Sequence, residues 1–312
     1  MRKSRKISKK NLTVEIIIGI LALIITTIYG YNLENNNENT QESQNIETIT
    51  AKEMQNVELT GAERIKIYFF DVGQADSILL TSNEQTMLID AGANETGKTV
   101  VKNLQNLGVT KIDYLVGTHP HEDHIGGLDD VINNFEIGTI YMPKIQTNTK
   151  NFEDVLDAVK NKNLKITAPK VGDTFNVGNI NCEIMSCDSK LAEKENNLNL
   201  SSIVIRAEFK EQSYLFMGDA ETKNENSRTW KQANVLKVGH HGSDTSSSKN
   251  FLNQIKPQIA IIQVGKDNSY GHPKQEILNR LAKLGILIYR TDEKGNILLE
   301  SDGINNKISF YK

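Results

Sequence analysis

Short apolar runs alternate with segments of helical periodicity from residue 64 to the end of the chain. The first runs, Arg64–Phe70, Ser77–Leu80 and Thr86–Asp90, are rich in β-branched and aromatic residues, which predicts a set of antiparallel strands. Apolar residues then recur at helical spacing, which predicts helices at Thr99–Leu107, Leu128–Phe135, Phe152–Lys160 and Gln275–Leu284. Further strands are expected at Asp113–Val116, Thr139–Met142, Ser202–Glu208, Tyr214–Met217, Val235–Val238, Ile259–Gln263 and Leu287–Arg290. Strands outnumber helices and helices interrupt them, so one mixed α and β domain is predicted over residues 64–312.

The N-terminal residues have a different pattern. Residues 1–11 carry six basic side chains, and Leu12–Tyr31 is an apolar run broken only by Glu15 and a few small or hydroxyl residues. Some twenty helical residues at about 1.5 Å each span roughly 30 Å, the thickness of a bilayer's hydrocarbon core. A cleaved secretory signal is the rival interpretation, but no small-x-small cleavage site follows the run. An uncleaved single-pass membrane anchor is therefore predicted, with residues 1–11 in the cytoplasm and the rest outside the cell membrane.

Residues 32–63 are rich in Asn, Glu, Gln and Thr and offer little for an apolar core, so they are predicted to form a disordered tether. Without the six basic residues at the start, the net charge of −3 becomes about −9 for the remaining chain. This charge argues against a broad basic face that grips nucleic acid, although it leaves room for a local basic groove.

All six histidines fall in three short motifs. They are His119, His121 and His124 in THPHEDHIGG, His240 and His241 in LKVGHHGS, and His272 in YGHP. Histidines that cluster beside carboxylates and glycines indicate a metal site. Four acidic or histidine motifs directly follow apolar strand-like runs, at Asp90, His119, Asp219 and His240. Strand ends can converge at one edge of the sheets, so these motifs are expected to build one site.

The THPHEDH segment has the spacing of a metal site. Alternation in an extended loop would place His119 and His121 on one side, with Asp123 and His124 turning toward a second side. Imidazole nitrogens and carboxylate oxygens suit Zn, Mn or Fe, and two neighbouring metal positions fit this spacing. The glycines at 126 and 127 would let the backbone pass close to the site before the next helix.

This segment resembles the signature of the metallo-β-lactamase fold superfamily. The neighbouring motifs resemble its ComEC-type branch, the nuclease-like domain of bacterial DNA-uptake proteins. Residues 70–77 (FDVGQADS) are similar to that branch's opening DVGQGDS, with Ala75 in place of a glycine, and residues 88–92 (LIDAG) resemble the superfamily's first acidic motif. The segments YLFMGDAE, LKVGHHGS and YGHP complete the likeness, which covers residues 64–312. It implies an α+β fold, a four-layer αββα sandwich, following the predicted N-terminal transmembrane helix.

The resemblance implies a centre for one or two divalent metal ions, Zn or Mn. His119 and His121 would hold one ion, Asp123 and His124 the other, and Asp219 would bridge the two.

His240 or His241 would complete the second position. His240 is preferred because it follows the strand first, and His241 would then contact substrate. Asp90 is expected to be a further ligand or to orient one, although Asp90 or Asp219 could instead be a turn residue.

One stretch departs from many hydrolases of the superfamily, which carry another histidine on the strand before Asp219. Here that stretch contains Asn199 and Ser202, and the ComEC-type branch has a similar N-x-x-S. The absence of that histidine weakens the first metal position. Asn199 or Ser202 could supply a neutral oxygen or hold a water there, and such a site would favour Mn over Zn. Both residues, together with Gln74 and Asp76, are expected at the substrate-binding edge.

The chemistry implied is hydrolysis by a metal-activated water. Asp123 or Asp90 could orient that water or take its proton. His272, if protonated, or His241 could donate to the developing charge, although His272 could instead cap the helix starting near Lys274.

Three functions are compatible with these residues. The first is a membrane-anchored extracytoplasmic phosphodiesterase or nuclease that acts on single-stranded or double-stranded DNA. The second is a hydrolase of a small cell-wall, lipid or lactone ester. The third is a non-catalytic binding module on a degenerate metal site. No protein partner can be identified from the sequence.

Overall fold

The computed structural model describes residues 54–311, so the predicted basic segment, membrane anchor and most of the predicted tether lie outside the described residues. Within residues 54–311 no helix has the length and apolar character needed to cross a membrane. The predicted tether ends earlier than residue 63, because Leu59 is buried and the backbone N–H groups of Thr60 and Gly61 donate to Asp302 Oδ2 at 3.0 and 3.2 Å.

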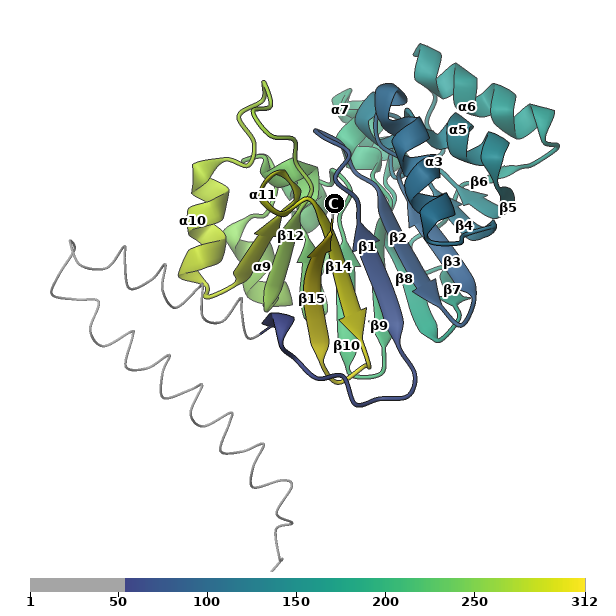
Figure 1. The fold of residues 1–312 in the computed structure, drawn as a ribbon. Helices are drawn as coiled ribbons and strands as arrows, with labels where there is room; N and C mark the ends of the chain where they lie inside the picture. The colour runs from purple at the N-terminus through teal and green to yellow at the C-terminus, as the bar shows by residue number, and fades with distance from the viewer. Residues whose placement is uncertain (1–53, 312) are drawn as a thin grey trace, which may run out of the picture. The chain divides into compact units, whose positions relative to one another are not determined.

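The first sheet has an antiparallel half and a parallel half (Figure 1). Its strand order is β15-β14-β1-β2-β3-β4-β5-β6, antiparallel as far as β3 and parallel from there to β6. The strands are β1 (Ile65–Phe69), β2 (Ile78–Ser82), β3 (Gln85–Ile89), β4 (Lys111–Val116), β5 (Glu136–Tyr141), β6 (Ile166–Thr167), β14 (Asn296–Ser301) and β15 (Asn306–Tyr311). Three helices, α3 (Gly97–Asn106), α5 (Leu128–Asn134) and α6 (Lys150–Asn161), pack their apolar sides on this sheet in one buried cluster.

The second sheet has the order β13-β12-β11-β10-β9-β8-β7, parallel from β10 to β13 and antiparallel from β7 to β10. Its strands are β7 (Thr174–Val177), β8 (Ile180–Ser186), β9 (Val204–Phe209), β10 (Gln212–Phe216), β11 (Val235–Lys237), β12 (Ile259–Ile262) and β13 (Leu287–Arg290). Two helices, α9 (Lys249–Ile255) and α10 (Gln275–Lys283), share a second buried cluster with these strands and lie beside them in Figure 1.

The two sheets pack against each other. The rings of Phe69 in β1 and Phe216 in β10 lie 6.4 Å apart, and Tyr214 Oη donates to Asn306 Oδ1 at 3.0 Å. Shorter helices occupy the connections: η1 (Asn94–Thr96), α4 (Glu122–Ile125), α7 (Ser189–Glu195), η2 (Leu198–Ser201), α8 (Thr222–Asn226), η3 (Gly239–Gly242) and α11 (Thr291–Lys294). The predicted two-sheet α+β architecture is confirmed, with helices on the outer side of each sheet.

All four predicted helices are present with ends shifted by at most two residues. The sequence-based prediction missed the C-terminal hairpin of β14 and β15, the strand β7, and α9. The missed strand β14 alternates buried and half-buried positions, which is the pattern of a strand with one face on a core.

The predicted strand ends meet at one edge. Asp90 follows β3, His119 follows β4, Asp219 follows β10 and His240 follows β11. A backbone hydrogen bond from Ile203 N to Thr118 O (2.9 Å) joins the two sheets at this edge. Chain segments far apart in the sequence therefore place their polar side chains together.

Candidate metal centre

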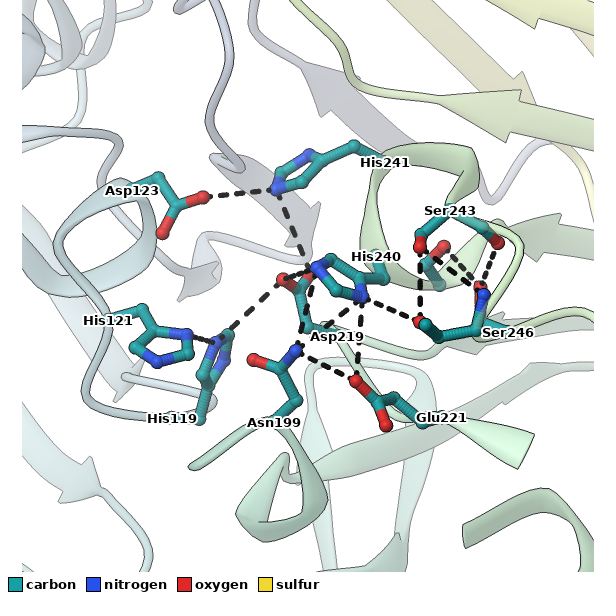
Figure 2. Close-up of polar contacts among 12 residues, drawn as sticks. His119, His121, Asp123, Asn199, Asp219, Glu221, His240, His241, Ser243 and Ser246 are labelled. Atoms are coloured by element: carbon teal, nitrogen blue, oxygen red, sulfur yellow. Dashed lines mark hydrogen bonds and ion pairs between the residues drawn. The ribbon is translucent and has the colours of Figure 1, made fainter. Parts of the chain in front are cut away.

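Asp219 lies at the centre of the site (Figure 2), buried and with its backbone N–H donating to Ser202 Oγ at 3.2 Å. Its Oδ1 is 3.2 Å from His124 Nε2 and 3.8 Å from His241 Nε2. Its Oδ2 is 3.8 Å from His119 Nε2 and 3.7 Å from His240 Nε2. The two oxygens of this carboxylate thus face two different sets of histidines.

The first set, called the Asp123 group, consists of Asp123, His124, Asp219 and His241, whose ligand atoms all lie within 4.8 Å of one another. His241 Nε2 is 3.3 Å from Asp123 Oδ2, and His124 Nε2 is 3.9 Å from the same oxygen. His124 Nε2, His241 Nε2 and Asp219 Oδ1 are buried and make no hydrogen bond of ordinary geometry within residues 54–311. Buried polar atoms are almost always paired, so this convergence of nitrogens and oxygens fits a divalent cation.

Outer contacts orient the two histidines of this group. His124 Nδ1 lies 2.7 Å from Asp90 Oδ2, and His241 Nδ1 lies 2.9 Å from the carbonyl oxygen of Gln263. These contacts fix each ring with its Nε2 toward Asp219, as partners of metal-bound histidines commonly do.

Asp90 accepts hydrogen bonds from the Thr118 backbone N–H and hydroxyl at 2.8 Å each. Its oxygens are thus engaged on the Nδ1 side of His124, away from the Asp123 group. Of the two roles predicted for Asp90, this contact supports the one that orients His124, while Asp90 also lies with Asp76 and His124 in a second cluster of possible ligand atoms within 4.8 Å of one another.

Asp76 was expected at the substrate edge, but it is buried behind His241. Its Oδ1 is 3.3 Å from His241 Nδ1, and its Oδ2 is 2.7 Å from Lys237 Nζ. The side chains of Lys237 and Asp76 are 0% and 2% exposed. Sequence reasoning missed Lys237, although a lysine inside the apolar strand VLKV was a signal for a buried partner.

The second set, called the His119 group, consists of His119, His121, His240 and Asp219 Oδ2. His119 Nε2 lies 2.9 Å from His121 Nδ1. His240 Nδ1 lies 2.9 Å from Thr245 Oγ1 and 3.7 Å from Glu221 Oε1.

The neighbours His240 and His241 turn to different groups because of their backbone. Both have φ of 51° within η3, a left-handed conformation that is uncommon for histidine. The His240 N–H donates to Gly218 O at 3.0 Å, which ties this turn to the loop before Asp219. The predicted preference for His240 beside Asp123 and His124 is corrected by this geometry, because His241 occupies that place.

The remaining predicted substrate residues are placed as follows. Asn199 is buried and donates through Nδ2 to Glu221 Oε1 at 3.0 Å, and the same nitrogen lies 3.5 Å from both ring nitrogens of His240. Ser202 is fully buried and supports the Asp219 backbone, so it does not face substrate. Gln74 is half-buried, and its Oε1 accepts from Gly265 N at 3.1 Å.

The prediction that the glycines after the THPHEDH segment permit close backbone approach is confirmed. A Cβ added at Gly126 would lie 2.3 Å from Asn94 N, and one at Gly127 would lie 2.3 Å from Ala91 O. This tight packing holds the loop of His119 to His124 against the end of β3.

Burial and charge shift the pKa values in opposite directions in the two groups. Burial lowers the pKa of His119 well below its ordinary value, and it also lowers that of His121. In the Asp123 group burial opposes the imidazolium, but Asp219 and neighbouring carboxylates outweigh it, so the pKa of His124 is well raised and that of His241 rises to about 10. The Asp123 group therefore holds protons where a cation would bind, whereas His119 and His121 are neutral.

His272 lies at the open side of the site. Its ring centroid is 5.7 Å from that of His240 and 5.8 Å from that of Tyr270, with which it stacks. Burial, with positive charge at His240 and His241, lowers the pKa of His272 to about 4. The ring is therefore neutral at pH 7, and the condition attached to its predicted donor role, a protonated imidazole, is not met.

Comparisons with known proteins agree with this architecture. Residues 70–266 match the Metallo-beta-lactamase superfamily. ComE operon protein 3 of Bacillus subtilis is 30% identical over 254 residues, which cover 74% of this chain and 32% of that protein. Competence protein ComA of Neisseria gonorrhoeae is 29% identical over 235 residues, covering 72% of this chain and 31% of that protein. The chain thus spans about a third of the length of these curated relatives.

Two solved structures share the fold at low sequence identity. YhfI from Bacillus subtilis, titled a metallo-beta-lactamase fold protein, has a TM-score of 0.51 at 11% identity, covering 77% of this chain and all of that one. CmlA from Streptomyces venezuelae, titled a diiron beta-hydroxylase, has a TM-score of 0.50 at 15% identity, covering 81% of this chain and 55% of that one.

Proposed function

The chain belongs to the metallo-β-lactamase superfamily, with relatives among the ComEC-type competence proteins, and on this basis we propose that it is a metal-dependent phosphodiesterase or nuclease that cleaves DNA. The observation that carries the proposal is the central position of Asp219, whose two oxygens face two groups of histidines and would each be available to a cation. Paired cation positions around one carboxylate suit phosphoryl chemistry, because charge on both the attacking and leaving oxygens can be neutralised.

When bound, divalent cations supply a water that loses its proton near neutral pH, and they neutralise charge on the phosphate. Zn and Mn are the proposed ions, since both accept imidazole nitrogens and carboxylate oxygens. In the Asp123 group, Asp123, His124, Asp219 and His241 would hold one of them.

The side chain of Asp123 is 32% exposed, which makes it the carboxylate of that group open to solvent and substrate. His124 and His241 lower its pKa against the opposing effect of burial, so it is ionised and can accept a hydrogen bond from the attacking water.

Residues at the rim complete the proposed reaction. His272 is neutral, and its buried Nδ1 makes no hydrogen bond within the described residues. A neutral imidazole can donate its N–H to the leaving oxygen without first gaining a proton. Gln74 lies at the same edge and can donate to a non-bridging phosphate oxygen through its amide.

The DNA substrate is supported by the relatives and by an aromatic residue at the rim. Tyr270 is 65% exposed, and its loop is fixed by Asn268, which donates through Nδ2 to His272 O at 2.6 Å and accepts from His272 N at 3.0 Å. Exposed aromatic rings on fixed loops bind unpaired bases by stacking. This feature favours single-stranded over double-stranded DNA, and the net charge of −3 agrees with the absence of a broad basic face.

We also propose that the enzyme is anchored in the cell membrane by residues 12–31, with the hydrolase domain outside. The support is the apolar run behind a basic segment, since this charge asymmetry keeps the N-terminus in the cytoplasm. The tether would then hold the active site within reach of DNA near the surface.

A cavity favours the small-ester hydrolase as a second candidate. It measures about 560 Å³ and is lined by residues that include Lys144, Phe152 and Asn197. None of its lining residues belongs to the two cation groups, and its link to the site is Asn197 Nδ2, which donates to Glu221 Oε2 at 3.0 Å, while Glu221 Oε1 lies 3.7 Å from His240 Nδ1. Its volume is in the range of small-ligand sites.

The test uses the full chain in detergent with labelled single-stranded DNA and Mn²⁺ or Zn²⁺. Asp123→Ala removes the open carboxylate, and Asp157→Ala, an exposed aspartate of α6, is the matched control. We expect metal-dependent cleavage by the wild type and the control and at least a 100-fold loss in Asp123→Ala. Intact DNA together with cleavage of a small ester would favour the second candidate, and no turnover of either would refute both and leave the binding module.

A further inference from the structure

We propose that His240 completes a second cation position, made by the His119 group, so that the adjacent histidines 240 and 241 serve two different ions. This inference rests on the proposed metal-dependent function. It differs from the expectation that one of these histidines binds beside Asp123 while the other contacts substrate.

Three distances within the His119 group are close to those between the ligand atoms of a tetrahedral site. Ligand atoms about 2.1 Å from a tetrahedral ion lie roughly 3.4 Å from each other. His119 Nε2 and His240 Nε2 are 3.8 and 3.7 Å from the same oxygen, Asp219 Oδ2. His121 Nδ1 adds a third nitrogen, 2.9 Å from His119 Nε2. Three imidazoles and one carboxylate oxygen satisfy the coordination number that zinc prefers.

The second ring nitrogen of His240 is already held. Its Nδ1 lies 2.9 Å from Thr245 Oγ1, and that hydroxyl lies 3.1 Å from Ser243 Oγ. Glu221 Oε1 is 3.7 Å from the same nitrogen. A ring fixed at Nδ1 in this way presents Nε2 to a cation, which is the arrangement found behind metal-bound histidines.

The backbone conformation at His240 directs its ring toward Asp219 Oδ2. Its φ of 51° and ψ of 47° lie in the left-handed region, a strained conformation for a non-glycine residue that persists only where the surrounding structure imposes it. With both neighbours left-handed, the ring centroids of His240 and His241 stand 6.3 Å apart. The turn thereby delivers one imidazole to each oxygen of Asp219.

Asn199 is the competing ligand for this position. Its Oδ1 is buried and makes no hydrogen bond within residues 54–311, while its Nδ2 is bound to Glu221. An amide oxygen is a weaker ligand for zinc than an imidazole, so His240 is the expected donor and Asn199 its neighbour. If His240 is the ligand, His240→Gly should lose the ion; if Asn199 is the ligand, Asn199→Ala should lose it.

The experiment counts bound metal rather than activity. The full chain in detergent is loaded with Zn²⁺, dialysed and analysed by elemental mass spectrometry. His240→Gly and His241→Gly are matched variants, because both positions have φ of 51° and glycine adopts that conformation without strain. We expect about two ions per wild-type chain and about one in each variant.

Combination with Asp123→Ala assigns each histidine to its group. His241→Gly/Asp123→Ala damages only the Asp123 group and should retain one ion, whereas His240→Gly/Asp123→Ala damages both groups and should retain none. Retention of one ion by His240→Gly/Asp123→Ala would overturn the inference, as would loss of the second ion in Asn199→Ala but not in His240→Gly. A wild type that binds only one ion would overturn it too, whereas one that binds no ion would refute the proposed function itself.

Discussion

The buried ion pair between Lys237 and Asp76 connects the two sheets beneath the site. Lys237 ends β11 of the second sheet, and Asp76 lies between β1 and β2 of the first. Their charged atoms are 2.7 Å apart, and Lys237 Nζ also donates to the carbonyl of Val238 at 2.9 Å. Replacement of Lys237 by methionine keeps most of the unbranched apolar stem but removes the ammonium, which leaves His241 as the remaining cation beside the buried Asp76 carboxylate.

The expected cost follows from the burial of both partners. Removal of one member of a buried pair typically costs about 3–5 kcal/mol, because the other charge is left uncompensated in a medium of low dielectric. Burial acts to raise the pKa of Asp76, and Lys237 is the largest factor that outweighs it. We therefore expect Lys237→Met to lose about 3–5 kcal/mol of unfolding free energy at pH 7, and Lys237→Met/Asp76→Leu to recover much of that loss.

Urea denaturation of the metal-free chain, followed by circular dichroism, measures these free energies. Lys66→Met is the matched control: its ammonium is 47% exposed, 3.9 Å from Glu300, and should contribute no more than about 1 kcal/mol. A cost for Lys237→Met no greater than that for Lys66→Met would refute the argument. A double variant less stable than the single one would show that Asp76 matters through His241 rather than through Lys237.

Four further predictions concern the packing of the loop, the protons of the Asp123 group and the aromatic residue at the rim. Gly127→Ala should cost at least about 2 kcal/mol in urea unfolding, because its Cβ would meet Ala91 O at 2.3 Å, and a fully stable variant would show that this loop is not tightly packed. Zinc binding at pH 7 should release about two protons, since the pKa values of His124 and His241 are raised; calorimetry in buffers of different ionisation enthalpy measures this, and no release would contradict the shifts. Because the pKa of His241 is raised to about 10, the metal-free protein should become less stable as the pH rises from about 6.5 through about 10, where His241 loses its stabilising charge. A Tm that rises over this pH range would contradict this prediction. Tyr270→Ala should weaken binding of single-stranded DNA by about 1–3 kcal/mol in fluorescence anisotropy while Tyr270→Phe retains it, and equal binding by both would exclude base stacking.

The sequence predicted the helices and strands whose hydrophobic periodicity is strong, and it predicted the sheet edge at which the site lies. Motifs placed directly after apolar runs could be expected to converge, because parallel strands end at a common edge of a sheet. His119, Asp219 and His240 lie there together as expected. The hairpin of β14 and β15 was missed because its strands are half-exposed and carry charged residues, which weakens the pattern.

The roles within the site depend on geometry that a linear pattern does not contain. Two adjacent histidines are equivalent in sequence, and only the left-handed backbone at both sends their rings to different oxygens of Asp219. Asp90 and Asp76 follow strands as ligands do, yet each lies behind a histidine. Whether a carboxylate faces the cation or the far side of its imidazole is set by tertiary packing.

The fold itself leaves the reaction open. CmlA shares it and is titled a diiron beta-hydroxylase, so the arrangement of sheets is compatible with chemistry other than hydrolysis. Substrate choice must therefore come from side chains at the rim, above the buried histidines. Here these include Tyr270 and His272, on a loop that Asn268 fixes by hydrogen bonds to the backbone of His272. The ring of Tyr270 stacks on that of His272, and the His272 ring lies 5.7 Å from that of His240, so we expect substitutions at Tyr270 to act on substrate binding and on His272 before they affect the cation positions.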